Sequence, residues 1–438
     1  MMRTERSFLG MENLRLRSMD ELNPPHGMKI MQTIKSCAPV QINQSIRSMV
    51  ATDTIPLDEV SFSYCTNVTV LKLLRVRMKI LDLNALRHLR SLEYDSGWSL
   101  VSSNIAPPAV KVRGLARLSN LVVLLLDGIP GHSSWIEAIS GLTKLQILRL
   151  DSGTRWRPDD KHEIKYPNLR KLWSLRDVTM TRFRNRANTI SGFSKRMSFL
   201  RILDLSECSF LRCDGVGDLV ALEELNLSYC KKLNELPNLQ SLTRLRKLNI
   251  RNCGLTRALP GFGALIALEV LQAAGCFKLA QLLDLRKLIH LQVLNTSSGL
   301  VDSRGVELLT GLSNLTGLLK FNFYFCDFKD VSCLSHFSTL RELIITNCDK
   351  LERLPDIHKL TRLEMLEIYG CESLRIWEGL RGSRLLETVI SDHGNGAGVY
   401  PLLIETLECN GVPVTELPDA RSFPHLKHLY LSPPLLYQ

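Results

Sequence analysis

Twelve cysteines stand out chemically in this 438-residue chain, and their spacing limits what they can do. Four of them, Cys208, Cys230, Cys253 and Cys276, follow one another at intervals of 22 or 23 residues. No Cys-x-x-Cys pair of the kind that holds zinc occurs among the twelve. We therefore expect free thiols that pack as small apolar groups and donate weak hydrogen bonds, with no disulfide, metal or redox role.

Other residues that could carry catalysis have weak support. His425 and His428 form a His-x-x-His pair, but side chains three apart on a strand point to opposite faces, which disfavours a shared metal ion. Four carboxylates fall at exposed positions of the pattern described below: Glu223, Glu224, Glu364 and Glu367. A solvated charged surface explains them better than acid–base chemistry. We expect neither an enzyme nor a cofactor.

Positive charge concentrates in one stretch. Between Lys165 and Arg201 the chain has ten Lys and Arg against one acid, Asp177, and this net charge of +9 is most of the total of +11. The candidate docking residues of this basic stretch are Arg170, Lys171, Arg176, Arg182, Arg184, Arg186, Lys195 and Arg196. They suit an acidic protein partner or form a solvated loop. Nucleic acid is disfavoured because few aromatic side chains accompany the charges.

The elements that position these residues follow from one repeated template. Apolar residues recur at i, i+3 and i+5 with cysteine at i+8, as in Leu222, Leu225, Leu227 and Cys230. This is the pattern of leucine-rich repeats. It predicts an α/β solenoid, or horseshoe, with a parallel concave β-sheet and short helical or 3₁₀ turns or loops on the convex side. Cysteine at i+8 also occurs at Cys65, Cys208, Cys253, Cys276, Cys326, Cys348 and Cys371.

We expect about 15 coils over residues 51–438, after an irregular segment or cap over 1–50, with insertions near 98–114 and 177–196. Two overlapping units begin at Leu57 and Val68, and spacing alone does not decide between them. In one weak unit the template is set on Leu169, Leu172 and Ser174.

Positions i+1, i+2, i+4, i+6 and i+7 are expected to face the concave surface. Aromatic residues and arginine are enriched in binding hot spots, so we select this face as a candidate protein-binding surface. Its candidate residues are Arg149, Trp173, Tyr229, Asn249, Arg251, Lys320, Asn322, Tyr324, Tyr369 and Tyr430.

Two segments carry a more specific phrase, LxxLPxxxxLTRLxxLxIxxC, over 233–253 and 351–371. This phrase resembles the repeat region of plant intracellular nucleotide-binding leucine-rich-repeat disease-resistance proteins, nearest to their TIR class. The phosphate loop GxxxxGK[ST] of such receptors is missing, and no TIR domain is recognised. The resemblance implies a sensing and autoinhibitory region whose partner is a pathogen effector, a host protein under surveillance or another receptor domain.

Similar repeats also serve as substrate-recognition adaptors of ubiquitin ligases, which need an N-terminal helical F-box that residues 1–50 do not display. No apolar run is long enough to span a bilayer, and the N-terminal residues lack the apolar core of a signal peptide. We therefore expect a cytoplasmic or nucleocytoplasmic location.

Overall fold

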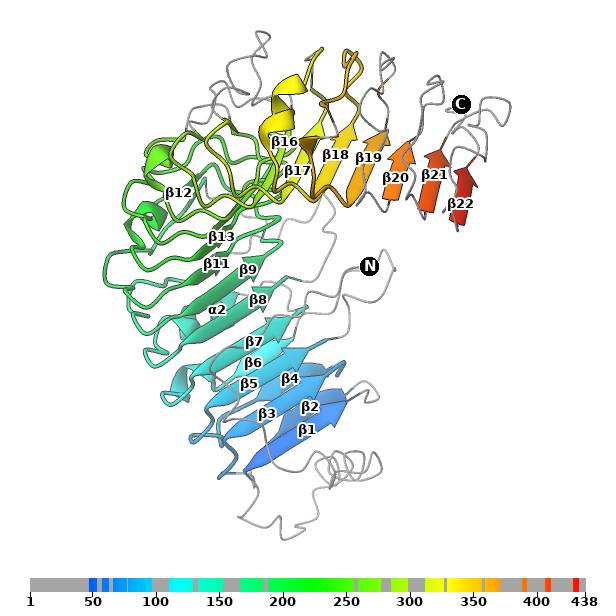
Figure 1. Cartoon of the computed structure of the whole chain (residues 1–438). Coiled ribbons are helices and arrows are strands. Elements are labelled where there is room, and N and C mark those ends of the chain that lie inside the picture. Colours follow the sequence, from blue (N-terminus) through cyan, green and yellow to red (C-terminus); the bar gives the residue numbers. More distant parts are fainter. Residues whose placement is uncertain are drawn as a thin grey trace.

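The chain winds into an arc of stacked coils whose inner side is one long parallel sheet (Figure 1). This computed structural model describes residues 47–52, 57–62, 66–76, 78–96, 110–128, 133–152, 166–183, 188–255, 259–276, 285–297, 312–326, 329–356, 359–369, 371, 388–391, 406–410 and 428–432. Seventeen strands form the inner sheet, and each pairs in register with the strand of the next coil.

The strands of this inner sheet, in spatial order, are β1 (Ser48–Thr52), β3 (Val70–Leu74), β5 (Ser91–Asp95), β7 (Val123–Asp127), β8 (Ile147–Asp151), β9 (Asp177–Thr181), β11 (Ile202–Asp204), β13 (Glu224–Asn226), β14 (Lys247–Asn249), β15 (Val270–Gln272), β16 (Val293–Ser297), β17 (Lys320–Tyr324), β18 (Glu342–Thr346), β19 (Met365–Tyr369), β20 (Thr388–Ser391), β21 (Thr406–Asn410) and β22 (His428–Ser432).

The template explains why these segments form strands. In the coil that begins at Leu222, the side chains of Leu222, Leu225 and Leu227 are at most 1% exposed, while Glu224 and Asn226 between them are half-buried. Alternation of this kind buries one face of a strand, and the next coil covers its open edge. The predicted parallel-sheet solenoid is confirmed; below, each coil is named after its residue at position i.

The convex side of the coils, where the chain returns from one inner strand to the next, has more varied secondary structure than the sequence indicates. We call it the return side. Short 3₁₀ helices occur at Leu115–Arg117, Val216–Asp218, Phe262–Ala264 and Ser332–His336, and α2 spans Ser133–Ile139. Two further parallel sheets, which the template did not predict, also lie there: β2 (Leu57–Ser61), β4 (Met78–Asp82) and β6 (Lys111–Arg113), and the pair β10 (Thr189–Ile190) and β12 (Arg212–Cys213).

The overlap of two template matches is thereby explained. The Leu57 unit forms β2 of the second sheet, and the Val68 unit forms β3 of the inner sheet. Both matches are therefore strands, on different sides of the solenoid. Strand β1 also begins at Ser48, within the segment expected to be irregular.

One predicted register is wrong. The strand near Leu169 is β9, and its buried residues are Leu175, Val178 and Met180, so position i is Leu175. The expected insertion at 177–196 therefore starts with a strand, and the step from Leu175 to Leu200 is an ordinary 25 residues (200 − 175). Much of the other expected insertion, residues 98–109, lies outside the described residues.

Among the described residues, no helix is both long and apolar enough to cross a bilayer.

Candidate functional site

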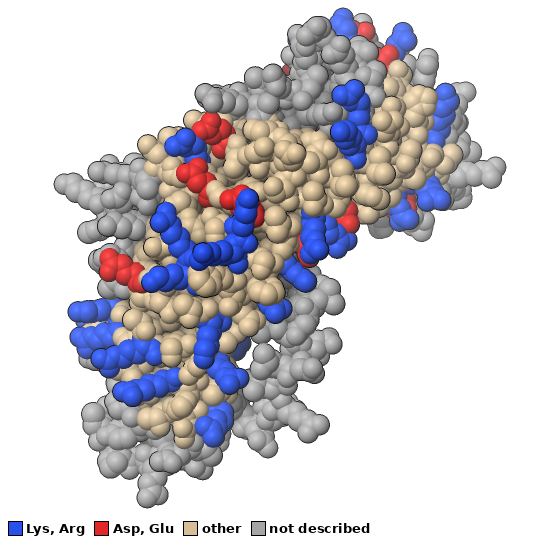
Figure 2. Space-filling view, turned by 90° about the vertical axis from the view of Figure 1, so that its left-hand side faces the viewer, with Lys and Arg blue, Asp and Glu red and all other residues tan. Residues whose placement is uncertain are grey.

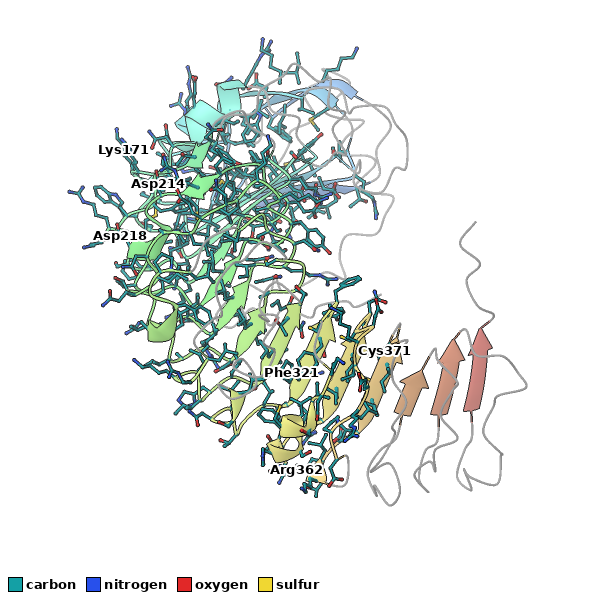
Figure 3. The ribbon with its side chains drawn as sticks, turned by 90° about the horizontal axis from the view of Figure 1, so that it is seen from above. Lys171, Asp214, Asp218, Phe321, Arg362 and Cys371 are labelled. Carbon is teal, nitrogen blue, oxygen red and sulfur yellow. The ribbon has the colours of Figure 1, made fainter. Side chains whose placement is uncertain are left out.

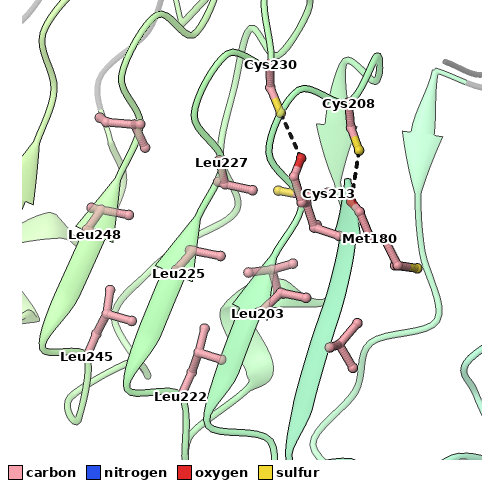
Figure 4. Packing of buried hydrophobic residues seen from close by; sticks show 14 of the residues in the cluster. Met180, Leu203, Cys208, Cys213, Leu222, Leu225, Leu227, Cys230, Leu245 and Leu248 are labelled. Carbon is pink, nitrogen blue, oxygen red and sulfur yellow. Dashed lines mark hydrogen bonds between the residues drawn. The ribbon is translucent and has the colours of Figure 1, made fainter. Parts of the chain in front are cut away.

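The cysteines at position i+8 form a hydrogen-bonded column inside the solenoid (Figure 4). The thiol of Cys208 donates to the carbonyl of Met180 at 3.1 Å, and that of Cys230 donates to the carbonyl of Leu205 at 3.1 Å. The thiols of Cys253 and Cys276 each bond a carbonyl of the preceding coil at 2.9 Å. The predicted hydrogen-bonding role is confirmed for these four residues.

Burial makes these thiols poor nucleophiles. It raises the pKa of Cys230 to about 12 and of Cys276 to about 11, because the thiolate loses its hydration. All nine cysteines whose side chains are described are free. In the later coils the thiols of Cys326 and Cys348 bond carbonyls of their own coil, at 3.6 and 3.5 Å, and Cys65 lies outside the described residues.

Three of the four carboxylates considered for acid–base chemistry take part in ion pairs between coils. Glu224 bonds Lys247 at 2.7 Å, Glu223 lies 3.6 Å from Arg201, and Glu364 lies 3.4 Å from Arg341. These pairs are solvated, so each stabilises the fold by less than about 1 kcal/mol. No group of three His, Cys, Asp or Glu within the described part of the chain could hold a metal ion.

The centre of the inner sheet carries a row of side-chain amides at position i+4. Strand pairing places Asn226, Asn249, Gln272, Asn295 and Asn322 next to one another on five consecutive strands. The Oδ1 atoms of Asn226 and Asn249 accept backbone N–H groups of their own coils at 3.1 Å. Those of Asn295 and Asn322 are buried without a partner. The oxygens of these four asparagines therefore face the protein. The Nδ2 of Asn226 donates to Oδ2 of Asp204 at 3.0 Å, and the N–H donors of Asn249, Asn295 and Asn322 are left toward the concave surface.

The position after each inner strand, i+7, has an unusual backbone. All seven non-glycine residues with positive φ in the described part of the chain occupy it: Arg75, Arg182, Glu207, Tyr229, Asn252, Phe325 and Asn347. Gly128 and Gly275 have positive φ at the same position. Its N–H bonds the next coil, as Tyr229 does to the carbonyl of Arg251 at 2.7 Å, so stacking imposes the left-handed conformation. For residues other than glycine, asparagine and aspartate, this left-handed conformation costs about 1–2 kcal/mol.

Exposed large apolar side chains gather on two margins of the inner sheet. Tyr229 and Phe325, at i+7, are 43% and 48% exposed; we call the i+7 positions the strand-end margin. The other five precede the strands, at i−2 or i−1: Trp173, Phe199, Val220, Ile266 and Ile289. The described surface shows no other exposed large hydrophobics, so this placement is selective.

The margin that precedes the inner strands is also basic. We call positions i−5 to i+2 of the coils of Leu89, Leu121, Leu145, Leu175 and Leu200 the strand-start surface. It contains one acid, Asp177, and ten basic residues: Arg87, Arg90, Arg117, Lys144, Arg170, Lys171, Arg176, Lys195, Arg196 and Arg201. Figure 2 shows Lys and Arg gathered over the lower half of the outer side, and Figure 3 places Lys171 on that side. Four of these residues come from outside the predicted basic stretch.

The predicted basic stretch is therefore split by the fold. Arg170, Lys171, Arg176, Lys195 and Arg196 lie on the strand-start surface and are exposed. Arg182 lies instead on the strand-end margin, where it bonds Asp151 of the preceding coil. Arg184 and Arg186 lie outside the described residues.

The structure places the candidate concave residues on different parts of the surface. Arg149, Asn249, Lys320, Asn322 and Tyr324 lie on inner strands, with Tyr229 and Arg251 just after them. Trp173 does not face the concave sheet, because the corrected register places it two residues before Leu175, where Arg196 lies 5.1 Å over its ring. Strands β19 and β22 contain Tyr369 and Tyr430, whose side chains are not described. Phe325 was overlooked, although its i+7 position could have identified it.

Known proteins provide partial matches. No family model matches the chain. A putative disease resistance protein of Arabidopsis thaliana is 36% identical over 185 residues, which is 41% of this chain and 13% of that protein. Among solved structures, a leucine-rich-repeat protein of Leptospira interrogans is 18% identical over 75% of this chain and 79% of its own, with a TM-score of 0.47. An internalin of Listeria monocytogenes is 15% identical over 92% of this chain and 94% of its own, with a TM-score of 0.45. The strand register makes the chain a parallel β-solenoid, and the matched segment spans only 13% of the length of the Arabidopsis protein.

Proposed function

We propose that this chain is a non-catalytic protein-recognition scaffold. The observation that carries the proposal is the placement of exposed apolar side chains on the two margins of the inner sheet and nowhere else on the described surface. Exposed aromatic and aliphatic groups near Arg and Lys are typical of binding hot spots. A solenoid positions such groups across many coils, which suits a broad protein surface better than a small ligand.

The strand-start surface supports a partner of acidic character. On this surface Trp173 is 45% exposed beneath the guanidinium of Arg196, with Lys171 and Lys195 in the same two coils. An acidic surface with an apolar group for Trp173 would pair with these charges, and the contact would weaken with salt.

The partial match to a disease resistance protein supports a role in plant defence. In this proposal the chain is the sensing and autoinhibitory repeat region of a TIR-class receptor located in the cytoplasm or the cytoplasm and nucleus. Its partner is a pathogen effector, a host protein under surveillance or another domain of the receptor. No observation favours the ubiquitin-ligase adaptor.

Proximity labelling in plant leaf cells tests this function. The chain, fused to a biotin ligase, is compared with a variant in which Lys171, Lys195 and Arg196 are changed to Glu and Trp173 to Ser. A control variant reverses three exposed charges elsewhere, at Lys231, Lys232 and Arg362. We expect the parent chain to label a reproducible set of proteins. The first variant should no longer label them, and the control variant should label them as the parent does. Identical sets for all three would contradict the proposal, and ligase core subunits among them would favour the adaptor.

A further inference from the structure

Tyr229 and Phe325 occupy positions where neither folding nor solubility favours an aromatic residue. Both have positive φ, of 62° and 54°, and both rings remain about half exposed. Gly128, Asn252 and Gly275 adopt this conformation at lower cost in other coils, and the other strained side chains at the position, Arg75, Arg182 and Glu207, are charged. Backbone strain that the fold does not need is characteristic of functional positions.

The inner sheet beside the line that joins these two rings offers hydrogen-bond donors. Position i+4 carries Asn249, Gln272 and Asn295 on the three intervening strands, with Asn226 and Asn322 on the strands of the two rings. Because their oxygens face the protein, Asn249, Asn295 and Asn322 present N–H groups to the concave side, whereas Asn226 donates to Asp204 at 3.0 Å. The Arg251 guanidinium, 6.0 Å over the Tyr229 ring, adds further donors. A matching ligand is rich in acceptors, as a peptide backbone is.

The separation of the rings sets the length of that ligand. Tyr229 and Phe325 lie four coils apart, and strands in a sheet are about 4.8 Å apart, so the rings are about 19 Å apart along the sheet. An extended polypeptide covers this distance in about six residues at roughly 3.3 Å each.

We propose that the strand-end margin between Tyr229 and Phe325 binds an extended polypeptide segment that carries two apolar side chains about six residues apart. The two rings cover the apolar side chains, and the amide row, three positions before the rings on each coil, donates to the carbonyl groups of the segment. The inference rests on the proposed function and specifies the partner's chemistry on this side of the sheet.

The test selects phage-displayed random 12-residue peptides on the full chain and measures their affinities for variants. Tyr229→Asn with Phe325→Asn removes both rings while fitting the left-handed backbone, as Asn252 does. Asn347→Gly, on the same margin but outside the span from Tyr229 to Phe325, is the control. We expect peptides with two apolar residues five to seven apart, whose affinity falls at least 10-fold for the double variant and less than 2-fold for the control.

A second readout separates binding from a structural role. Hydrogen exchange in β13 and β17 should be as slow as in the parent chain or slower in the double variant, because the strain is relieved. Tyr229→Ala, which keeps the strain, should lose peptide affinity without slowing exchange. Faster exchange in the double variant, or unchanged peptide affinity, would overturn the inference.

Two further outcomes would also overturn it: no peptide selected on the parent chain, or single-stranded RNA bound in place of peptides with the same dependence on both rings. A failure of this inference would leave the proximity-labelled set unchanged, whereas a failure of the proposed function would abolish that set.

Discussion

The guanidinium of Arg182 reaches back one coil to the carboxylate of Asp151, with Nη2 2.5 Å from Oδ2. This contact ends a column of three aspartates, Asp95, Asp127 and Asp151, that strand pairing places in register at position i+6. Burial first, and then the charges of Asp151 and Asp95, raises the pKa of Asp127 to about 6, and Arg182 partly offsets the rise. The column is therefore a local source of instability.

Asp127→Asn should stabilise the chain near neutral pH. Because the folded pKa lies above the unfolded value of about 3.9, folding favours the protonated acid, and that stability is lost as the pH rises through about 6. The ionised Asp127 carboxylate lowers the free energy of unfolding by about 1 kcal/mol, once the effect of the pKa shift is reduced for partial solvent exposure. Denaturation at pH 7.5 and 4 should show a gain only at pH 7.5. Asp218→Asn, on the outer side, is the control, and an equal gain at both values would contradict the prediction.

Loss of the thiol at Cys230 should weaken the coils of Leu200 and Leu222. Cys230→Ala leaves the buried carbonyl of Leu205 without its donor, which costs about 1–3 kcal/mol. Cys230→Ser keeps a donor and should cost less. Hydrogen exchange in β11 and β13 measures both variants, and an alanine variant as stable as the parent would show that the bond contributes nothing.

The column thiols should resist alkylation. With the pKa of Cys230 at about 12, raised mainly by burial, the thiolate is scarce at pH 8. Iodoacetamide followed by peptide mass spectrometry should leave Cys230 and Cys276 unmodified in the native chain and modify both in denaturant. Rapid native modification at either residue would show that the column opens.

Gly275→Ala should destabilise the chain by about 1–2 kcal/mol or more, because φ is +79° and a Cβ would lie 1.9 Å from the side-chain oxygen of Asn252. Gly263→Ala, in the 3₁₀ helix Phe262–Ala264, meets nothing within 4 Å and should be nearly neutral. Chemical denaturation of both variants tests whether i+7 imposes the left-handed backbone. Equal stabilities would contradict the strain assigned to Tyr229 and Phe325.

Leucine spacing predicts most of the inner sheet because one face of every strand is buried by the same apolar triplet. It fails at β9, where Val178 and Met180 replace leucine, so that Leu169 and Leu172 seemed the better match. The return-side strands β2 and β4 have no such repeat and were recognisable only as competing or unassigned segments.

The candidate surfaces were harder to predict because they depend on which residues stacking brings together. Arg87 and Arg117 join Lys171 and Arg196 only when successive coils align. The strain at i+7 was hidden because Arg182, Glu207 and Phe325 give no sequence signal for positive φ; only the glycines and asparagines there could have suggested it.

The most direct test of the recognition scaffold is the dissociation constant of a labelled partner, measured with purified proteins at low and physiological salt. The account predicts binding at least 10-fold weaker when Lys171, Lys195 and Arg196 are reversed to Glu and Trp173 is changed to Ser, with a smaller salt dependence than the parent chain. The variant reversed at Lys231, Lys232 and Arg362 should bind as the parent does. Equal dissociation constants for all three proteins would contradict the account.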